Sequence, residues 1–155
     1  MSFDFSSLPA SLRIKSHLDE LDVLINWFDH LDLSGFDDPF LPIEAKTALV
    51  EGFTNVVQHA HAQLSDKTPV EINVERNGPA LQIMIWDIGP FYDFSAAMKQ
   101  LSGAAAQEFD PLLRERHWGQ VLFLKLSRER GWQFTYDRLP DDRNCLSMVR
   151  TLMPS

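Results

Sequence analysis

Apolar and polar positions alternate with two different periods in the first part of the chain. From residue 18 to 31 apolar side chains recur every three or four positions, which is the spacing of one buried helix face. Ser16 stands just before this run and is predicted to cap the helix, because a hydroxyl can accept a hydrogen bond from a first-turn amide. Before it, Leu12 and Ile14 alternate with polar residues and predict a short strand. Residues 31–42 contain two prolines and a glycine and are predicted to form a connector.

A second helix is predicted from about residue 43 to 63. Its apolar side is formed by Leu49, Val50, Phe53, Val56, Val57 and Ala60. Glu51, Asn55 and His59 follow one another at intervals of four and fall on roughly the opposite side. His61 is two positions from His59, so the two imidazoles point to different sides of a helix. This spacing favours a capping or surface role for them over a metal pair.

The first of two predicted β-hairpins follows the second helix. Apolar and polar residues alternate strictly from 70 to 75, and Leu81, Ile83 and Ile85 continue the period of two on a return strand, as in half-buried strands. Asn77 and Gly78 lie between the two runs and predict a tight turn, because both residue types tolerate a positive φ. The return strand ends at Asp87.

The second predicted hairpin closes the chain. Aromatic residues alternate with polar ones from 132 to 136, residues 140–143 form a turn, and alternation resumes from 145 to 150. Just before this hairpin, the apolar run within residues 119–130 predicts a short buried helix. Residues 88–118 are weakly patterned and are predicted to form a lid, with short helices near Phe94–Leu101 and at the three alanines 104–106.

This order of elements predicts the fold class. A strand, two helices, a hairpin, a lid, a helix and a second hairpin suit an α/β (α+β) two-layer sandwich. The expected sheet is mixed and mainly antiparallel, and three helices cover one of its faces. Residues 1–155 are expected to form a single domain.

Composition narrows the possible functions. Twenty-two acidic residues against 14 Lys and Arg give a formal net charge of −8, which argues against a general nucleic-acid binder. Cys145 is the only cysteine, so neither an intrachain disulfide nor a cysteine-based zinc site is expected. The sequence shows no secretion signal and no apolar run long enough for a membrane span, so a cytoplasmic protein is expected.

The strongest candidates for chemistry lie on the second helix. Glu51 and Asn55 are one turn apart, so both can reach the same ligand. A carboxylate can accept the proton of an attacking hydroxyl, and an amide oxygen can ligate Mg²⁺. The pair therefore suits phosphoryl transfer. The alternative is an ordinary solvated helix face.

Two further segments are weaker candidates when each is taken alone. Asp87 at a strand end, followed by Gly89, is either a plain turn or a carboxylate that can accept the amino group of a base. The segment from His117 to Gln120 precedes an apolar helical run, and free amides at a helix start favour anions such as phosphate. An ordinary junction between a loop and a helix is the alternative for this segment.

Together, the three segments resemble a known superfamily. Glu51, Asn55 and His59, then Asp87 and Gly89, then Gly119 before an apolar helix are similar to the N, G1 and G2 boxes of GHKL-type (histidine kinase-like) ATP-binding domains. Within that superfamily, the phrases Glu51–Ala60 and Leu146–Leu152 resemble the bacterial anti-sigma factor serine kinases. The resemblance extends from about residue 12 to 152 and implies the Bergerat-type ATP-binding fold.

The resemblance also implies an activity and its partners. Glu51 would be the general base that activates a serine hydroxyl of a partner, and Asn55 would ligate the Mg²⁺ of bound ATP. The substrate implied is a STAS-type anti-anti-sigma protein, and a sigma factor is the second partner of such a partner-switching module. Homodimerisation is implied by the resemblance alone, and neither nucleic acid nor a membrane is an expected direct partner.

The remaining implied roles concern the nucleotide. Asp87 would bind the adenine amino group, and Gly89 would leave room for the base. Gly119, Gln120 and the amides around them would face the phosphates.

The sequence departs from the superfamily pattern at three positions. Phe91 stands where the G1 box has a second glycine, and Trp118 and Val121 stand where glycines are expected in the G2 box. These changes define an alternative, a degenerate scaffold that holds a sigma factor or STAS protein without turning over ATP. The presence of Glu51 and Asn55 favours nucleotide binding.

Overall fold

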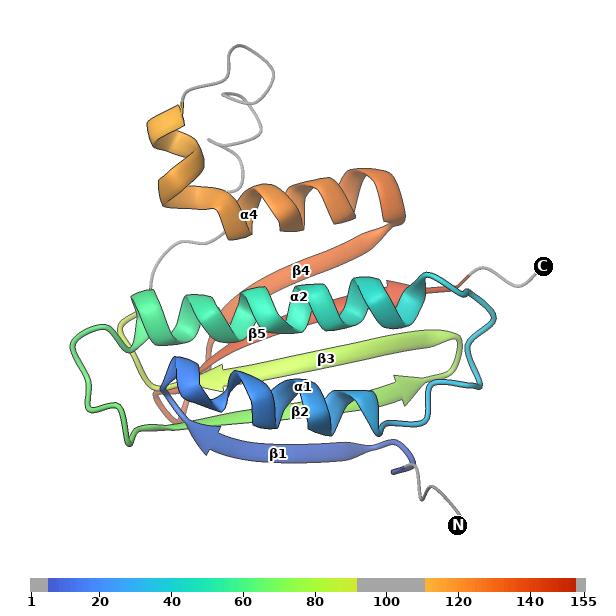
Figure 1. The fold of residues 1–155 in the computed structure, drawn as a ribbon, viewed down its shortest axis with the longest axis horizontal. Coiled ribbons are helices and arrows are strands. Elements are labelled where there is room, and N and C mark those ends of the chain that lie inside the picture. Colours follow the sequence, from blue (N-terminus) through green and yellow to red (C-terminus); the bar gives the residue numbers. More distant parts are fainter. Residues whose placement is uncertain (1–5, 92–110, 153–155) are drawn as a thin grey trace.

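A five-stranded sheet forms one layer of the molecule (Figure 1). The computed structural model describes residues 6–91 and 111–152, with the backbone alone for 111–120. The strands lie in the order β1-β2-β3-β5-β4. Their bounds are Ala10–Lys15 (β1), Pro69–Asn77 (β2), Ala80–Asp87 (β3), Trp132–Arg138 (β4) and Asn144–Thr151 (β5). All four pairings between the described strands are antiparallel, so the sheet is antiparallel there and the expected mixed character is wrong.

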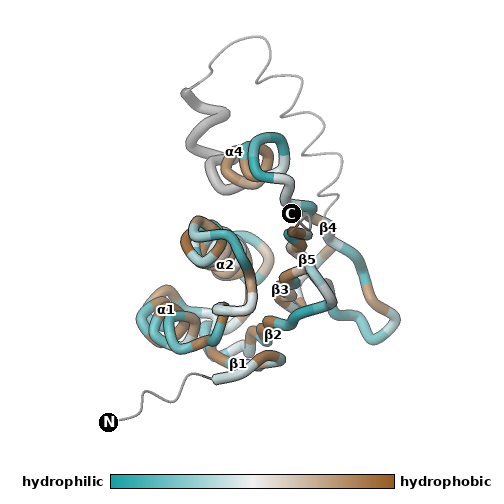
Figure 2. Tube along the Cα trace, turned by 90° about the vertical axis from the view of Figure 1, so that its right-hand side faces the viewer, coloured by the Kyte–Doolittle hydropathy of each residue, from teal (hydrophilic) through white to brown (hydrophobic). Residues whose placement is uncertain are grey.

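The helices form the second layer. They are the 3₁₀ turn Leu18–Glu20 (η1), Leu21–Asp29 (α1), Leu41–Asn55 (α2), the π-helical turn Val56–Ala60 (η2) and Pro111–Arg130 (α4). Viewed along the sheet, α1, α2 and α4 lie on the same side of it, with α1 near β1 and α4 near β4 (Figure 2). The predicted α/β two-layer fold is confirmed.

Alternation along the strands explains the core between the layers. In β3, Leu81, Ile83 and Ile85 are fully buried and face the helices, while the residues between them are partly exposed. From the helical layer Phe53 and Phe123 reach the same core and have no exposed surface. Each large apolar side chain of this kind contributes about 1.5–3 kcal/mol when it leaves water.

Both predicted hairpins are confirmed, with one correction at the first turn. Asn77 still pairs with Ala80 across the strands, so the two-residue loop is Gly78-Pro79, one position later than predicted. Gly78 alone of this pair needs a positive φ, at 57°, and glycine adopts that backbone without steric cost.

The start of the first helical segment also differs from the prediction. His17, rather than Ser16, caps it, since the His17 Nδ1 atom accepts a hydrogen bond of 3.0 Å from the Asp19 amide. Ser16 is buried at the end of β1, and its hydroxyl has no partner among the described residues. The first turn is 3₁₀, and the α-helix begins only at Leu21.

The last helix is longer than predicted. It begins at Pro111 instead of Gly119, so eight residues that were assigned to the lid are helical. Proline is favoured at the first position of a helix, because its missing N–H has no partner there in any case. The rest of the predicted lid, including the helices expected near Phe94–Leu101 and 104–106, lies outside the described residues except for 88–91.

Candidate functional site

Glu51 and Asn55 lie in the second half of α2, one turn apart, as predicted. Both side chains are partly buried, and neither makes a hydrogen bond or ion pair with any described residue. Burial raises the pKa of the Glu51 carboxyl above its ordinary value. Half-buried polar groups that have no partner in the described part of the chain are candidates for contact with a ligand.

Gly52 fixes the distance between this helix and the sheet. A Cβ atom at Gly52 would lie 2.6 Å from Cδ1 of Ile85 and 3.3 Å from Cδ2 of Leu146. The helix therefore packs closely onto β3 and β5 between the two polar side chains. This contact positions Glu51 and Asn55 relative to the end of the sheet that carries Asp87.

The helix widens immediately after Asn55. In the π-helical turn η2, the His61 amide donates to the carbonyl of Val56 at 2.7 Å, five residues back. The wider turn breaks the predicted alignment of His59 with Glu51 and Asn55, and His59 is exposed. Single π turns are frequent at functional sites.

Asp87 is buried at the end of β3, with 1% of its surface exposed, and its carboxylate is held by three donors. Its Oδ1 atom accepts from the Gly89 amide at 3.0 Å and from Nδ2 of Asn144 at 2.8 Å. Its Oδ2 atom accepts from the Tyr136 hydroxyl at 2.8 Å. A carboxylate offers about four acceptor positions, so one position on Oδ2 remains for a further N–H donor.

A polar row crosses three strands at this end of the sheet. Asp87 pairs with Asn144 across β3 and β5, and Asn144 pairs with Arg138 across β5 and β4. The Asn144 amide also donates to the Gly89 carbonyl at 2.8 Å, and Arg138 donates to the same carbonyl at 3.2 Å. The turn after β3 is therefore fixed by side chains of β5 and β4, which lie in that order on one side of β3.

Gly89 has a packing reason of its own. A Cβ atom at this position would lie 2.0 Å from the carbonyl oxygen of Ala60, so no side chain fits while η2 keeps its place. This contact brings the turn after β3 against the end of the second helix. The role of Gly89 beneath a base stays a prediction.

His61 connects the end of the second helix to the turn after β3, and a capping or surface role was expected for it. Instead it is 3% exposed, and its Nε2 atom accepts from the Ile88 amide at 3.0 Å. Its Nδ1 atom is buried without a partner among the described residues. Burial lowers the pKa of His61, although the nearby Asp87 carboxylate acts in the opposite direction. The surface alternative is wrong because this imidazole is buried, whereas His61 does stand at the C-cap position of η2.

Aromatic rings lie beside the Asp87 carboxylate. Phe91 is stacked on Tyr136, with ring centroids 5.5 Å apart and planes inclined by 7°. Tyr136 is buried and Phe91 is half exposed. The ring that replaces the second G1 glycine thus packs onto the residue that donates to Asp87.

Gly119 and Gln120 do not lie in the first turn of a helix. Both residues lie inside α4, eight and nine positions after its first residue, whereas free amides occur only in the first turn of a helix. The premise that they stand at a helix start is wrong. Their contact with phosphate stays a prediction that rests on the resemblance alone.

Sequence reasoning missed three residues of this site, Tyr136, Arg138 and Asn144. A signal for one of them is present in the pattern. Asn144 shares its strand face with Leu146 and Met148, both buried, so a polar residue stands at a core position. Such a residue needs hydrogen-bond partners, and Asp87 and Gly89 supply them.

The donor set fits a Mg-nucleotide in part. Asn55 offers a free amide oxygen of the kind that Mg²⁺ accepts, and Asp87 offers one acceptor position to an amino group. Among the described residues no three His, Cys, Asp or Glu side chains converge as in a protein-only metal site. A metal held mainly by nucleotide phosphates needs no such cluster.

Comparison with known proteins agrees with this arrangement. The family model of the histidine kinase-like ATPase domain matches residues 27–150, so the chain belongs to that family. Among solved structures, one similar chain comes from the SiaB-SiaC complex of Pseudomonas aeruginosa. It has 12% sequence identity and a TM-score of 0.57, over 92% of this chain and 89% of that one. This likeness shows the shared fold.

No curated protein matches the chain. Within the part of the chain that the structure describes, no helix combines the length and the apolar character needed to cross a membrane.

Proposed function

We propose that this protein is an ATP-dependent regulator of a partner-switching module, which binds Mg·ATP and phosphorylates a serine of a STAS-type anti-anti-sigma protein. The observation that carries the proposal is the pair Glu51 and Asn55, which are one turn apart, partly buried and without a hydrogen-bond or ion-pair partner among the described residues. Membership of the histidine kinase-like ATPase family supports nucleotide binding. The similar chain from a SiaB-SiaC complex supports the search for a protein partner, and a sigma factor is the second partner proposed.

The residues have distinct tasks in this proposal. Asn55 contributes its amide oxygen to Mg²⁺, and Asp87 accepts a hydrogen bond from the amino group of adenine. When bound, ATP would supply the phosphoryl group, and its Mg²⁺ would offset the negative charge of the phosphates. Glu51 accepts the proton of the partner's serine hydroxyl while the serine oxygen bonds to the γ-phosphorus and the bond from that phosphorus to the β-phosphate oxygen breaks. The products are phosphoserine and ADP.

The first experiment measures nucleotide binding by titration calorimetry. Mg·ATP is titrated into the parent protein and into Asn55→Ala, with Asn26→Ala on the exposed face of α1 as the matched control. The proposal expects binding by the parent and by Asn26→Ala, and at least tenfold weaker binding by Asn55→Ala. Equal binding by all three proteins would contradict the assignment of Asn55.

The second experiment separates binding from chemistry. Transfer of the γ-phosphate to a purified STAS-type partner is followed with Glu51→Gln and with the exposed control Glu129→Gln. Glu51→Gln is expected to bind Mg·ATP and to lose transfer, because an amide cannot accept the serine proton. Transfer at the parent rate in this variant would show that another group is the base.

A second candidate function is favoured by the aromatic contacts at Asp87. The Tyr136 hydroxyl already occupies one acceptor position of Oδ2, and the Phe91 ring is stacked on Tyr136. A scaffold that holds its partner without nucleotide would retain these contacts permanently. Absence of Mg·ATP binding by the folded parent protein, together with tight binding of a sigma factor or STAS protein, would establish this alternative.

A further inference from the structure

A cavity of about 980 Å³ lies far from the candidate site, at the other end of α2. It is an open groove lined by the end of α1, the connector 31–40 and the first turns of α2. Ile43 lines it and is twelve residues from Asn55, which corresponds to roughly 18 Å along a helix. A ligand in this cavity therefore contacts a surface separate from the pair Glu51 and Asn55.

The walls of the cavity are apolar. Phe28, Leu31, Leu33 and Phe36 form its base, and Ile43 stands at its edge. Ile43 is 64% exposed and its neighbour Phe40 is 61% exposed, the highest values among the large apolar side chains of the described residues. Exposed apolar groups beside a cavity are typical of interaction surfaces.

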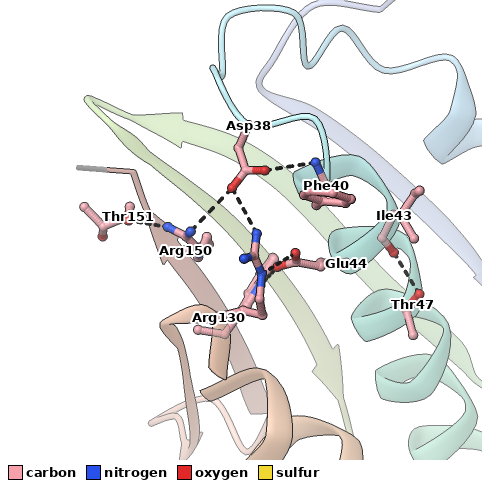
Figure 3. Close-up of polar contacts among 9 residues, drawn as sticks. Asp38, Phe40, Ile43, Glu44, Thr47, Arg130, Arg150 and Thr151 are labelled. Atoms are coloured by element: carbon pink, nitrogen blue, oxygen red, sulfur yellow. Dashed lines mark hydrogen bonds and ion pairs between the residues drawn. The ribbon is translucent and has the colours of Figure 1, made fainter. Parts of the chain in front are cut away.

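One wall of the cavity is held in place before any partner binds (Figure 3). Asp38 in the connector lies 3.3 Å from Arg130 at the end of α4 and 3.5 Å from Arg150 of β5. Glu44 in the first turn of α2 accepts from Arg130 at 2.7 Å and from the Trp132 indole at 3.0 Å. These contacts fix the connector and the start of α2 relative to each other.

The rim of the cavity is acidic. Four aspartates and one lysine line it, and Asp29 and Asp38 already have cationic partners in Lys46 and the two arginines. Asp37 makes no hydrogen bond or ion pair with any described residue. Asp32 accepts from the Ser34 hydroxyl at 2.5 Å and from the Ser34 amide at 3.0 Å, and these hydrogen bonds lower the pKa of its carboxyl. Within the described part of the chain, neither of these two carboxylates beside the apolar groove forms an ion pair.

We propose that this groove, formed by residues 28–46, binds a segment of a partner protein in which apolar side chains are flanked by lysine or arginine. The apolar side chains enter the cavity beside Ile43, and the basic ones pair with Asp32 and Asp37. Charge complementarity selects this occupant. A second copy of the chain also carries a net charge of −8, and residues 1–5 of the chain contain Asp4 and no basic side chain.

The test uses a synthetic 18-residue peptide of Leu and Lys at helical spacing and an acidic twin with Glu in place of each Lys. Both are titrated into the ¹⁵N-labelled full chain without nucleotide, so the result does not depend on the proposed function. Amide shifts caused by the basic peptide are expected to cluster at residues 28–46. The acidic twin is expected to leave the spectrum unchanged.

Matched variants separate the groove from the overall charge of the protein. Ile43→Ser and the double change Asp32→Asn, Asp37→Asn are each expected to weaken the basic peptide at least tenfold. Leu64→Ser and the double change Asp19→Asn, Asp66→Asn alter exposed residues elsewhere and are expected to leave its affinity unchanged. Equal weakening by both double changes, or shifts spread over the surface, would overturn the proposal in favour of nonspecific attraction.

The other occupants give distinct results. Self-association in sedimentation that Ile43→Ser abolishes would show that a second copy fills the groove. Tighter peptide binding after removal of residues 2–5 would show that the chain's own start competes for it. Either result would overturn the proposed partner segment.

Discussion

The hydroxyl of Tyr136 on β4 donates a 2.8 Å hydrogen bond to Oδ2 of Asp87 at the end of β3. The two residues come from strands separated by β5, and both are buried. The Asp87 carboxylate, which is proposed to bind adenine, is therefore oriented by the protein itself. An amino group that binds to Asp87 joins an existing hydrogen-bond network. Glu51 and Asn55, in contrast, have no such partners among the described residues.

Tyr136→Phe isolates this hydrogen bond, because it removes the hydroxyl and keeps the ring. Loss of a hydrogen bond to a charged group is expected to lower the free energy of unfolding by about 1.5–3 kcal/mol. An adenine amino group can then occupy the vacated acceptor position. Mg·ATP is therefore expected to raise the melting temperature of the variant more than that of the parent.

Mg·GTP provides the control for this experiment. The 6-oxo group of guanine accepts and cannot donate a hydrogen bond to the carboxylate, so it is expected to stabilise neither protein through Asp87. An identical ATP-induced shift in the parent and in Tyr136→Phe would show that the base does not use the acceptor position that the hydroxyl vacates.

Asn144 is predicted to be the main structural support of Asp87. It has no exposed surface and donates to both Asp87 Oδ1 and the Gly89 carbonyl. Asn144→Asp replaces a donor with a second carboxylate beside the first, and like charges at this distance are strongly unfavourable when buried. The urea midpoint is expected to fall sharply at pH 7 and to recover in part at pH 5, as the carboxylates share a proton.

The control for Asn144→Asp is Asn26→Asp on the exposed face of α1, which is expected to shift the urea midpoint little at either pH. Asn144→Ala is expected to lose stability without recovery at pH 5, because no new carboxylate is introduced. A pH-independent loss in Asn144→Asp would contradict the interpretation that charge repulsion is the cause.

The strands and the polar candidates differ in how far sequence could predict them. β2 follows from strict alternation and β3 from the period of two in Leu81, Ile83 and Ile85, and β3 ends at Asp87 as the sequence predicts. The hydrogen bond from Tyr136 is not a local property, because it depends on β5 lying between β3 and β4. The π turn after Asn55 has no signal in the sequence either, and it ends at Ala60, which packs against Gly89.

The start of α4 shows a different limit. The apolar pattern is clear only after residue 119, so it predicted a short helix and placed Gly119 at its first turn. Pro111 was an additional signal, because proline favours the first position of a helix. The roles that the resemblance gives to the N box and to Asp87 stay predictions, and it supplies no geometry for Gly119.

The raised pKa of Glu51 predicts the pH dependence of phosphoryl transfer. Burial disfavours the charged form, so Glu51 becomes an effective base only at a pH above the ordinary range for glutamate. The transfer rate is expected to fall on acidification, with a midpoint above the ordinary glutamate pKa. Mg·ATP affinity, measured by calorimetry over the same range, is the control. A midpoint in transfer that coincides with loss of ATP binding would assign the effect to the nucleotide instead.

His61 is predicted to make stability depend on pH. Burial lowers its pKa in the folded state, whereas in the unfolded chain it takes up a proton near pH 6.5. Below about pH 6.5 the unfolded state therefore binds more protons, and the free energy of unfolding falls as the pH decreases towards the folded-state pKa. Protonation also removes the acceptor for the Ile88 amide.

Urea unfolding of the parent at pH 7.5, 6.5 and 5.5 is expected to show this loss of stability. His61→Gln is expected to be less stable at pH 7.5 but to lose less on acidification, while the exposed control His59→Gln is expected to retain the parent's slope. The same slope in His61→Gln as in the parent would assign the pH dependence to other groups.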